Sequence, residues 1–66
     1  MKNRIKELRE QLNLTQIDFG KRLEVSRQTV ISLENGKYNP SLPLAYKIAK
    51  VFNKTIEEIF VFEEEE

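Results

Sequence analysis

Apolar side chains recur along the start of the chain at intervals of three, four and seven residues. Ile5, Leu8 and Leu12 follow this spacing, with Lys, Arg, Glu and Gln between them. Such a pattern is typical of an amphipathic helix with one face turned to a core. We therefore expect a first helix over residues 3–12, ended by Asn13.

Short hydroxyl residues mark the starts of four further helices. Thr15, Ser26, Ser41 and Thr55 each precede an amphipathic stretch, and their side-chain oxygens can accept a hydrogen bond from a backbone N–H of the first turn. Glu58 lies three residues after Thr55, which completes a capping box. The second helix is predicted from Thr15 to about Leu23, and the third over residues 27–35. The fourth is predicted from Ser41 to Phe52, and a short fifth helix around Ile56, Ile59 and Phe60.

The junction between the second and third helices is unusually short. Only Glu24 and Val25 precede the capping Ser26. If Glu24 must adopt a positive φ in this turn, it costs about 1 kcal/mol. Gly20, in the middle of the second helix, is either a tolerated flaw of about 1 kcal/mol or a place where another backbone approaches closely. The adjacent tight turn favours close approach.

These elements predict an all-α fold of five short helices. We expect one compact domain over residues 1–62 and an acidic tail over residues 63–66. Phe60 to Glu63 could form a short strand or a disordered tail. Because a chain of 66 residues has a thin core, dimerisation would be a natural source of further burial.

The composition removes several kinds of chemistry. The chain has no Cys and no His, which excludes disulfides, thiolate metal sites and the commonest general base. No nucleophile is paired with a base in the sequence, so we expect no enzyme, no cofactor and no metal. No apolar run approaches the roughly 20 residues of a membrane span, and no signal peptide opens the chain. A cytoplasmic protein is expected.

The formal net charge of zero conceals a strong asymmetry. Residues 1–54 hold all 11 Lys and Arg against five acids, a net charge of +6, whereas residues 55–66 hold six acids and no base. This contrast indicates a basic working surface followed by an acidic segment. The alternative is an ordinary mixed surface with a solvated tail.

The outward face of the third helix carries side chains suited to DNA base edges. At helical spacing, Arg27, Gln28, Ile31 and Ser32 lie opposite the apolar core positions. Arg pairs with guanine, Gln with adenine, Ser with several groups, and an apolar side chain with the thymine methyl. A tight turn before such a helix fits a helix-turn-helix, whose second helix enters the major groove. The alternative is a surface helix whose polar face has no role.

Four motifs then resemble one family: I-K-E-L-R at residues 5–9, L-T-Q at 14–16, V-S-R-Q-T at 25–29 and E-N-G-K-Y-N-P-S-L at 34–42. The chain resembles, over about residues 3–60, the phage repressor/Cro-type (XRE) helix-turn-helix family. Within that family it is similar to the small single-domain repressors of the cytolysin-repressor type. The resemblance implies a sequence-specific transcriptional regulator, a repressor that binds a near-palindromic DNA operator as a homodimer.

The resemblance also implies a role for individual residues. Base contacts are expected from Arg27, Gln28, Ile31 and Ser32. Phosphate contacts are expected from Gln16, Thr29, Lys37, Tyr38 and Asn39. Arg9 and Glu34 match a structural pair that ties the first helix to the end of the third.

A dimer interface is expected late in the chain, where apolar surface remains: Leu42, Ile56, Ile59, Phe60 and Phe62. Alternatively, Ile59 and Phe60 close the core of the monomer. The rival functional class is an antitoxin or another protein-interaction module on the same fold, although few residues remain after residue 60 to wrap a toxin. We expect any signal to reach the protein through an unknown protein partner or its own concentration.

Overall fold

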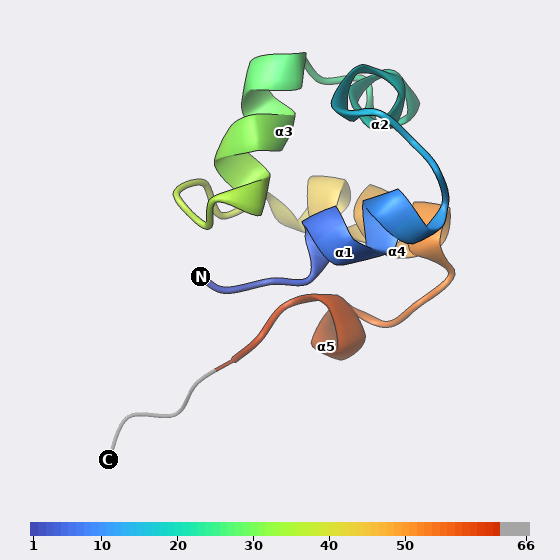
Figure 1. Cartoon of the computed structure of the whole chain (residues 1–66). Helices are drawn as coiled ribbons and strands as arrows, with labels where there is room; N and C mark the ends of the chain where they lie inside the picture. The colour runs from blue at the N-terminus through green and yellow to red at the C-terminus, as the bar shows by residue number, and fades with distance from the viewer. Residues whose placement is uncertain (63–66) are drawn as a thin grey trace.

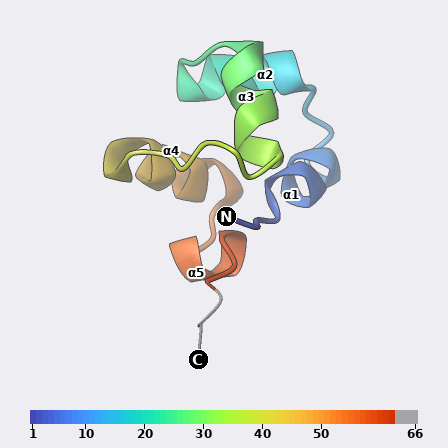
Figure 2. The same cartoon turned by 90° about the vertical axis from the view of Figure 1, so that its left-hand side faces the viewer.

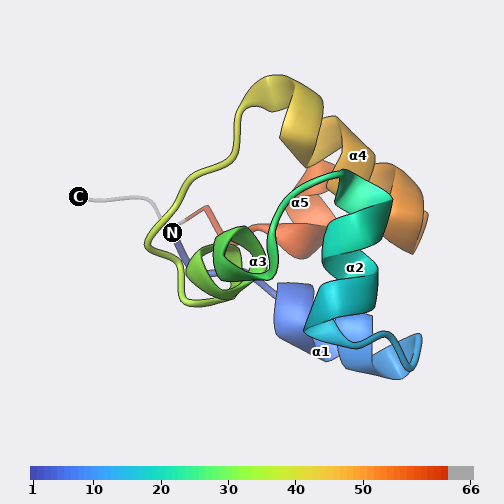
Figure 3. The ribbon, with the colours of Figure 1, turned by 90° about the horizontal axis from the view of Figure 1, so that it is seen from above.

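The computed structural model describes residues 1–62, and its five α-helices confirm the predicted all-α fold (Figure 1). The α2–α3 pair lies above α1 and α4, with α5 beneath them. Figure 3 shows α3 nearly end-on while α2 lies across the view, so the two helices cross steeply. The helices are α1 (Ile5–Gln11), α2 (Gln16–Leu23), α3 (Arg27–Glu34), α4 (Leu42–Phe52) and α5 (Ile56–Ile59).

The four predicted hydroxyl caps all form. Thr15, Ser26, Ser41 and Thr55 each accept a hydrogen bond from the backbone N–H three residues later, at 3.0, 3.2, 3.3 and 3.2 Å respectively. At Thr55 the capping box is complete, because its own N–H donates to a Glu58 carboxylate oxygen at 2.8 Å. This hydrogen bond lowers the pKa of Glu58 from its usual value.

The first helix is shorter than its sequence pattern predicts. It begins at Ile5 because the side-chain oxygen of Asn3 accepts the Ile5 N–H at 3.0 Å, which holds the preceding residues outside the helix. It ends at Gln11, so Leu12 lies beyond the last turn and is exposed. The expectation that Leu12 belongs to the apolar stripe was wrong. Leu14 packs against the core instead.

One apolar core joins all five helices. Phe19 of α2 stacks on Phe52 of α4, with ring centroids 5.1 Å apart and planes 16° apart. Ile5, Val30 and Ile59 are fully buried in the same core. The remaining buried apolar residues are Leu8, Leu23, Leu33, Ala45, Ile48 and Phe60.

The α2–α3 turn explains both unusual residues at this junction. A Cβ on Gly20 would lie 2.8 Å from the carbonyl oxygen of Val25, and the Val25 N–H donates to the Gly20 oxygen at 2.9 Å. Gly20 therefore marks a close backbone approach, as predicted. Glu24 has φ 63° and ψ 41°, so it does occupy the left-handed region, which is unfavourable for a residue with a Cβ.

Replacing Glu24 with Gly is expected to raise the free energy of unfolding by about 0.5–1 kcal/mol. Glycine removes the left-handed strain of about 1–2 kcal/mol. Two smaller losses oppose this gain: the greater freedom of Gly in the unfolded chain and the exposed ion pair between Glu24 and Lys47, 3.0 Å long. Denaturant unfolding measures the change. Lys47→Ala, which removes the pair alone, is the control and should cost under about 0.5 kcal/mol. A lower midpoint for Glu24→Gly would contradict the strain argument.

The two ends of the described chain pair with each other. The Arg4 N–H donates to the Ile59 oxygen at 2.8 Å, and the Val61 N–H donates to the Lys2 oxygen at 2.9 Å. Asn3 and Phe60 form an isolated antiparallel bridge. The C-terminal segment therefore contains no strand within the described residues: Phe60 takes part in this single bridge, and Val61 is held by its hydrogen bond to Lys2. The predicted acidic tail, residues 63–66, lies outside the described residues.

Candidate nucleic-acid interface

The third helix is anchored by its inner face and presents its outer face to solvent. Val30 and Leu33 are fully buried, which fixes the rotation of α3 about its axis. The same rotation leaves Arg27 and Gln28 exposed at its first turn and Ser32 half-buried one turn later. Ile31, the fourth residue expected to contact bases, is also half-buried. The side chains expected to contact bases therefore lie at the surface of one helix.

A tight loop folds back against the C-terminal end of this helix (Figure 1). Gly36 permits the reversal with φ 75°. The backbone N–H groups of Lys37 and Tyr38 then donate to the Ser32 carbonyl oxygen, at 3.1 and 3.3 Å. These hydrogen bonds place the exposed loop residues Lys37, Tyr38 and Asn39 beside α3. The loop expected to contact phosphates is thus held to the helix expected to contact bases.

The other two residues expected at phosphates are already engaged within the protein. Thr29 is half-buried; its hydroxyl lies 3.1 Å from that of Ser26, and its N–H donates to the Ser26 oxygen. Gln16 begins α2 and donates through Nε2 to a Glu34 carboxylate oxygen at 3.1 Å. An amide group carries a second N–H and an oxygen acceptor. Gln16 can therefore contact a phosphate while Glu34 fixes its side chain.

Arg9 and Glu34 form a buried ion pair beneath this surface. Arg9 Nε lies 2.6 Å from Glu34 Oε2, and their side chains are only 9% and 5% exposed. Arg9 Nη1 also donates to the Leu14 carbonyl oxygen at 2.7 Å, in the α1–α2 connection. Together with Gln16, the pair links the first three helices. It has no free acid or base for catalysis and serves as scaffold.

The N-terminal residues support the C-terminal end of α3 in a way that the sequence did not reveal. Asn3 donates through Nδ2 to the Leu33 carbonyl oxygen at 2.8 Å, and the Met1 amino group donates to the Gly36 oxygen at 2.9 Å. A Cβ on Gly36 would lie 2.7 Å from the Met1 oxygen. Figure 2 shows the N-terminus between the end of α3 and α5. Hydrophobic spacing carries no signal for such a contact, because the polar residues involved lie far apart in sequence.

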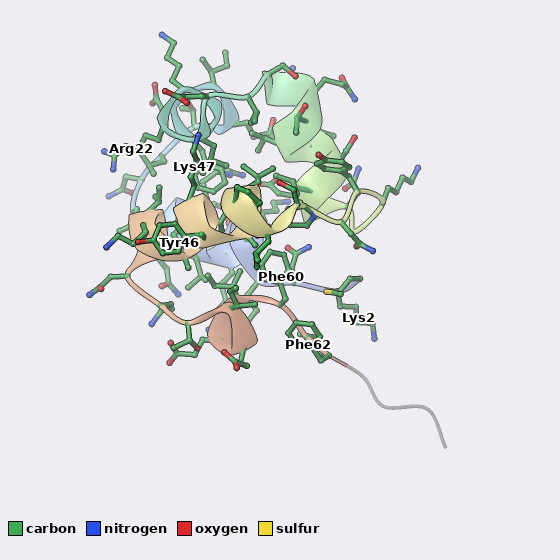
Figure 4. All side chains as sticks on the ribbon, turned by 180° about the vertical axis from the view of Figure 1, so that it is seen from behind. Lys2, Arg22, Tyr46, Lys47, Phe60 and Phe62 are labelled. Carbon is green, nitrogen blue, oxygen red and sulfur yellow. The ribbon has the colours of Figure 1, made fainter. Side chains whose placement is uncertain are left out.

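The residues expected to form a dimer interface divide into two groups. Ile59 and Phe60 are 0% and 4% exposed, so they close the monomer core, as the alternative interpretation held. Leu42 and Phe62 are 76% and 58% exposed. Together with Ile56 they border an apolar hollow of about 320 Å³, which is also lined by Met1, Asn39, Pro40, Ala45 and Phe60. Figure 4 shows Phe60 beneath α4 and Phe62 at the periphery.

Within residues 1–62, no helix is both long and apolar enough to cross a membrane. The same part of the chain contains no cluster of acidic side chains that could hold a metal ion.

Two helices joined by a tight turn, the second presenting a polar face beside the loop that carries Lys37, define a helix-turn-helix domain. Comparison with known proteins agrees with this geometry. The family model described as helix-turn-helix matches residues 5–59. The chain belongs to this family, which confirms the expected phage repressor/Cro type. Proteins of the family bind DNA and are not enzymes.

Several relatives match the whole chain. A protein of Archaeoglobus fulgidus is 61% identical over 66 residues, covering 100% of this chain and 93% of the relative. A protein of Methanocaldococcus jannaschii is 58% identical over 66 residues and is covered completely. YgzD of Bacillus subtilis is 48% identical over 65 residues, covering 98% of both chains. All three are named as HTH-type transcriptional regulators.

Proposed function

We propose that this protein is a transcriptional regulator, acting as a repressor, that binds a specific double-stranded DNA sequence in the cytoplasm with α3 in the major groove. The proposal rests chiefly on the face of α3. Its exposed Arg27 and Gln28 can each make two hydrogen bonds to a purine. The loop fastened to Ser32 would contact phosphates and so set the position of the helix. The names of the relatives also support regulation of transcription.

We further propose that the chain binds as a two-fold dimer. One helix of this length covers few base pairs, and dimers of helix-turn-helix proteins bind half-sites about 34 Å apart. The apolar hollow beside Leu42 and Phe62 is the surface best suited to a second copy. A symmetric contact there would cover both exposed side chains.

Selection from random duplexes tests the function. We expect a near-palindromic site whose affinity falls steeply as salt rises, because bound phosphates release counterions. Sedimentation of the selected complex should give two chains for each duplex. Equal affinity for every duplex would contradict sequence-specific binding. The proposed dimer would be contradicted if the protein is a monomer both in solution at high micromolar concentration and when bound to the duplex. Failure to bind DNA at all would favour the protein-interaction class.

A further inference from the structure

A small hollow opens beside the outer face of the recognition helix. Gln28, Thr29 and Ser32 of α3 line it on one side, and Tyr38 of the following loop lines it on the other. Its volume is about 150 Å³. Because Gln28 and Ser32 are expected to contact bases, Tyr38 lies next to the surface that would face the floor of the major groove.

The position of Tyr38 is fixed by the fold. Its backbone N–H donates to the Ser32 oxygen at 3.3 Å, which ties the residue to α3. Its side chain borders a second hollow as well, on the side of Val25, Pro43 and Leu44. The side chain is 43% exposed, so part of it packs on the protein while part remains available. Tyr38 therefore forms a wall between the two hollows.

The chemistry of the first hollow suits a base better than a phosphate. None of its four lining side chains carries a formal charge. Because neutral Gln, Ser, Thr and Tyr side chains also contact phosphates, the apolar part of the lining is what distinguishes a base from a phosphate here. The aromatic ring of Tyr38, the methyl of Thr29 and the methylenes of Gln28 supply carbon surface. The Gln28 amide and the hydroxyls of Ser32 and Tyr38 supply hydrogen-bonding groups.

Thymine combines the same two properties at its major-groove edge, where a 5-methyl group lies beside the O4 acceptor. We propose that this hollow receives the 5-methyl group of a thymine, and that Tyr38 is a specificity-determining residue rather than a phosphate contact. The inference rests on the proposed function, since it requires α3 to lie in the major groove.

Replacing single thymines with deoxyuridine in the selected duplex tests the proposal, because uracil lacks only the methyl group. At one thymine position of each half-site, replacement with uracil should weaken binding of the wild-type protein about fourfold. This is the loss of affinity expected when one buried methyl group is removed. Tyr38→Ala should bind the thymine and uracil duplexes equally. Tyr38→Phe, which keeps the ring, should retain the preference for thymine. Tyr46→Ala changes an exposed tyrosine on α4 and is the control that should also retain it.

Two results would overturn the proposal. One is that replacing thymine with uracil changes the affinity of the wild-type protein at no position. This measurement does not depend on the folding of any variant. The other is a sensitive thymine that remains equally sensitive in Tyr38→Ala. If either occurs while Arg27→Ala still relaxes base preference, the role of Tyr38 is wrong and the proposed function stands. If the wild-type chain selects no duplex, both are wrong.

Discussion

Replacing Arg9 with Met is expected to lower the free energy of unfolding by about 3–5 kcal/mol, the cost of leaving one member of a buried ion pair without its partner. The variant would leave the Glu34 carboxylate, whose side chain is only 5% exposed, without its cationic partner. It would also leave the Leu14 carbonyl oxygen without its 2.7 Å hydrogen bond. Folded proteins have a free energy of unfolding of about 0.05–0.15 kcal/mol per residue, which gives about 3–10 kcal/mol for a chain of 66 residues. The variant should therefore lose a large fraction of its stability, from about a third to all of it.

Circular dichroism during denaturant unfolding measures this effect, and the chain offers a matched control. Arg4 pairs with Glu7 at 3.1 Å, but their side chains are 45% and 55% exposed. Arg4→Met should therefore change the stability far less than Arg9→Met. The double variant Arg9→Met, Glu34→Leu removes both buried charges and should recover much of the loss. Equal stability of Arg9→Met and Arg4→Met would show that the buried pair has no special structural role.

Replacing Arg27 with Ala is expected to relax base preference at one position of each half-site, at a cost of about 1–3 kcal/mol. Arg27 is exposed at the first turn of α3, where its guanidinium can pair with guanine. Lys37→Ala should behave differently, because Lys37 lies on the loop expected to contact phosphates. It should weaken all duplexes by a similar factor and reduce the slope of log affinity against log salt by about 1.

Parallel selection from random duplexes with both variants distinguishes base contacts from phosphate contacts. The preferred site should be unchanged for Lys37→Ala and degenerate at one position for Arg27→Ala. A reversal of these two results would mean that α3 lies in the groove in another orientation. Uniform weakening by both variants would mean that Arg27 contacts only the backbone of the DNA.

The features that sequence predicted well are those whose partners lie three or four residues apart. Thr15, Ser26 and Thr55 specify helix starts because the N–H that each one caps is three residues away. The outer face of α3 follows in the same way, since burial of Val30 and Leu33 determines where Arg27 and Gln28 lie. Local hydrogen bonding and helical spacing thus identified the fold class and the residues exposed on the outer face of α3.

The features that sequence missed depend on contacts between distant segments. The start of α1 depends on Asn3, whose amide also reaches Leu33 on another helix. The hollow beside Tyr38 depends on the path of the loop after Gly36. The hollow forms only when the folded loop lies beside α3, because both contribute lining residues. Exposure of Leu12 depends on an early helix end. Periodicity contains none of this information.

The pairing of residues 2–4 with residues 59–61 has a consequence for the order of folding. It closes nearly the whole chain into a loop, so it carries a larger entropy cost than contacts between neighbouring helices. Local helix pairs such as α2 and α3 should therefore form early, and the two ends should join late. The apolar hollow is lined by Met1, next to one of these paired segments, and by Phe62, next to the other. A partly folded chain should therefore lack this surface, and the proposed dimer would form only between chains that have finished folding.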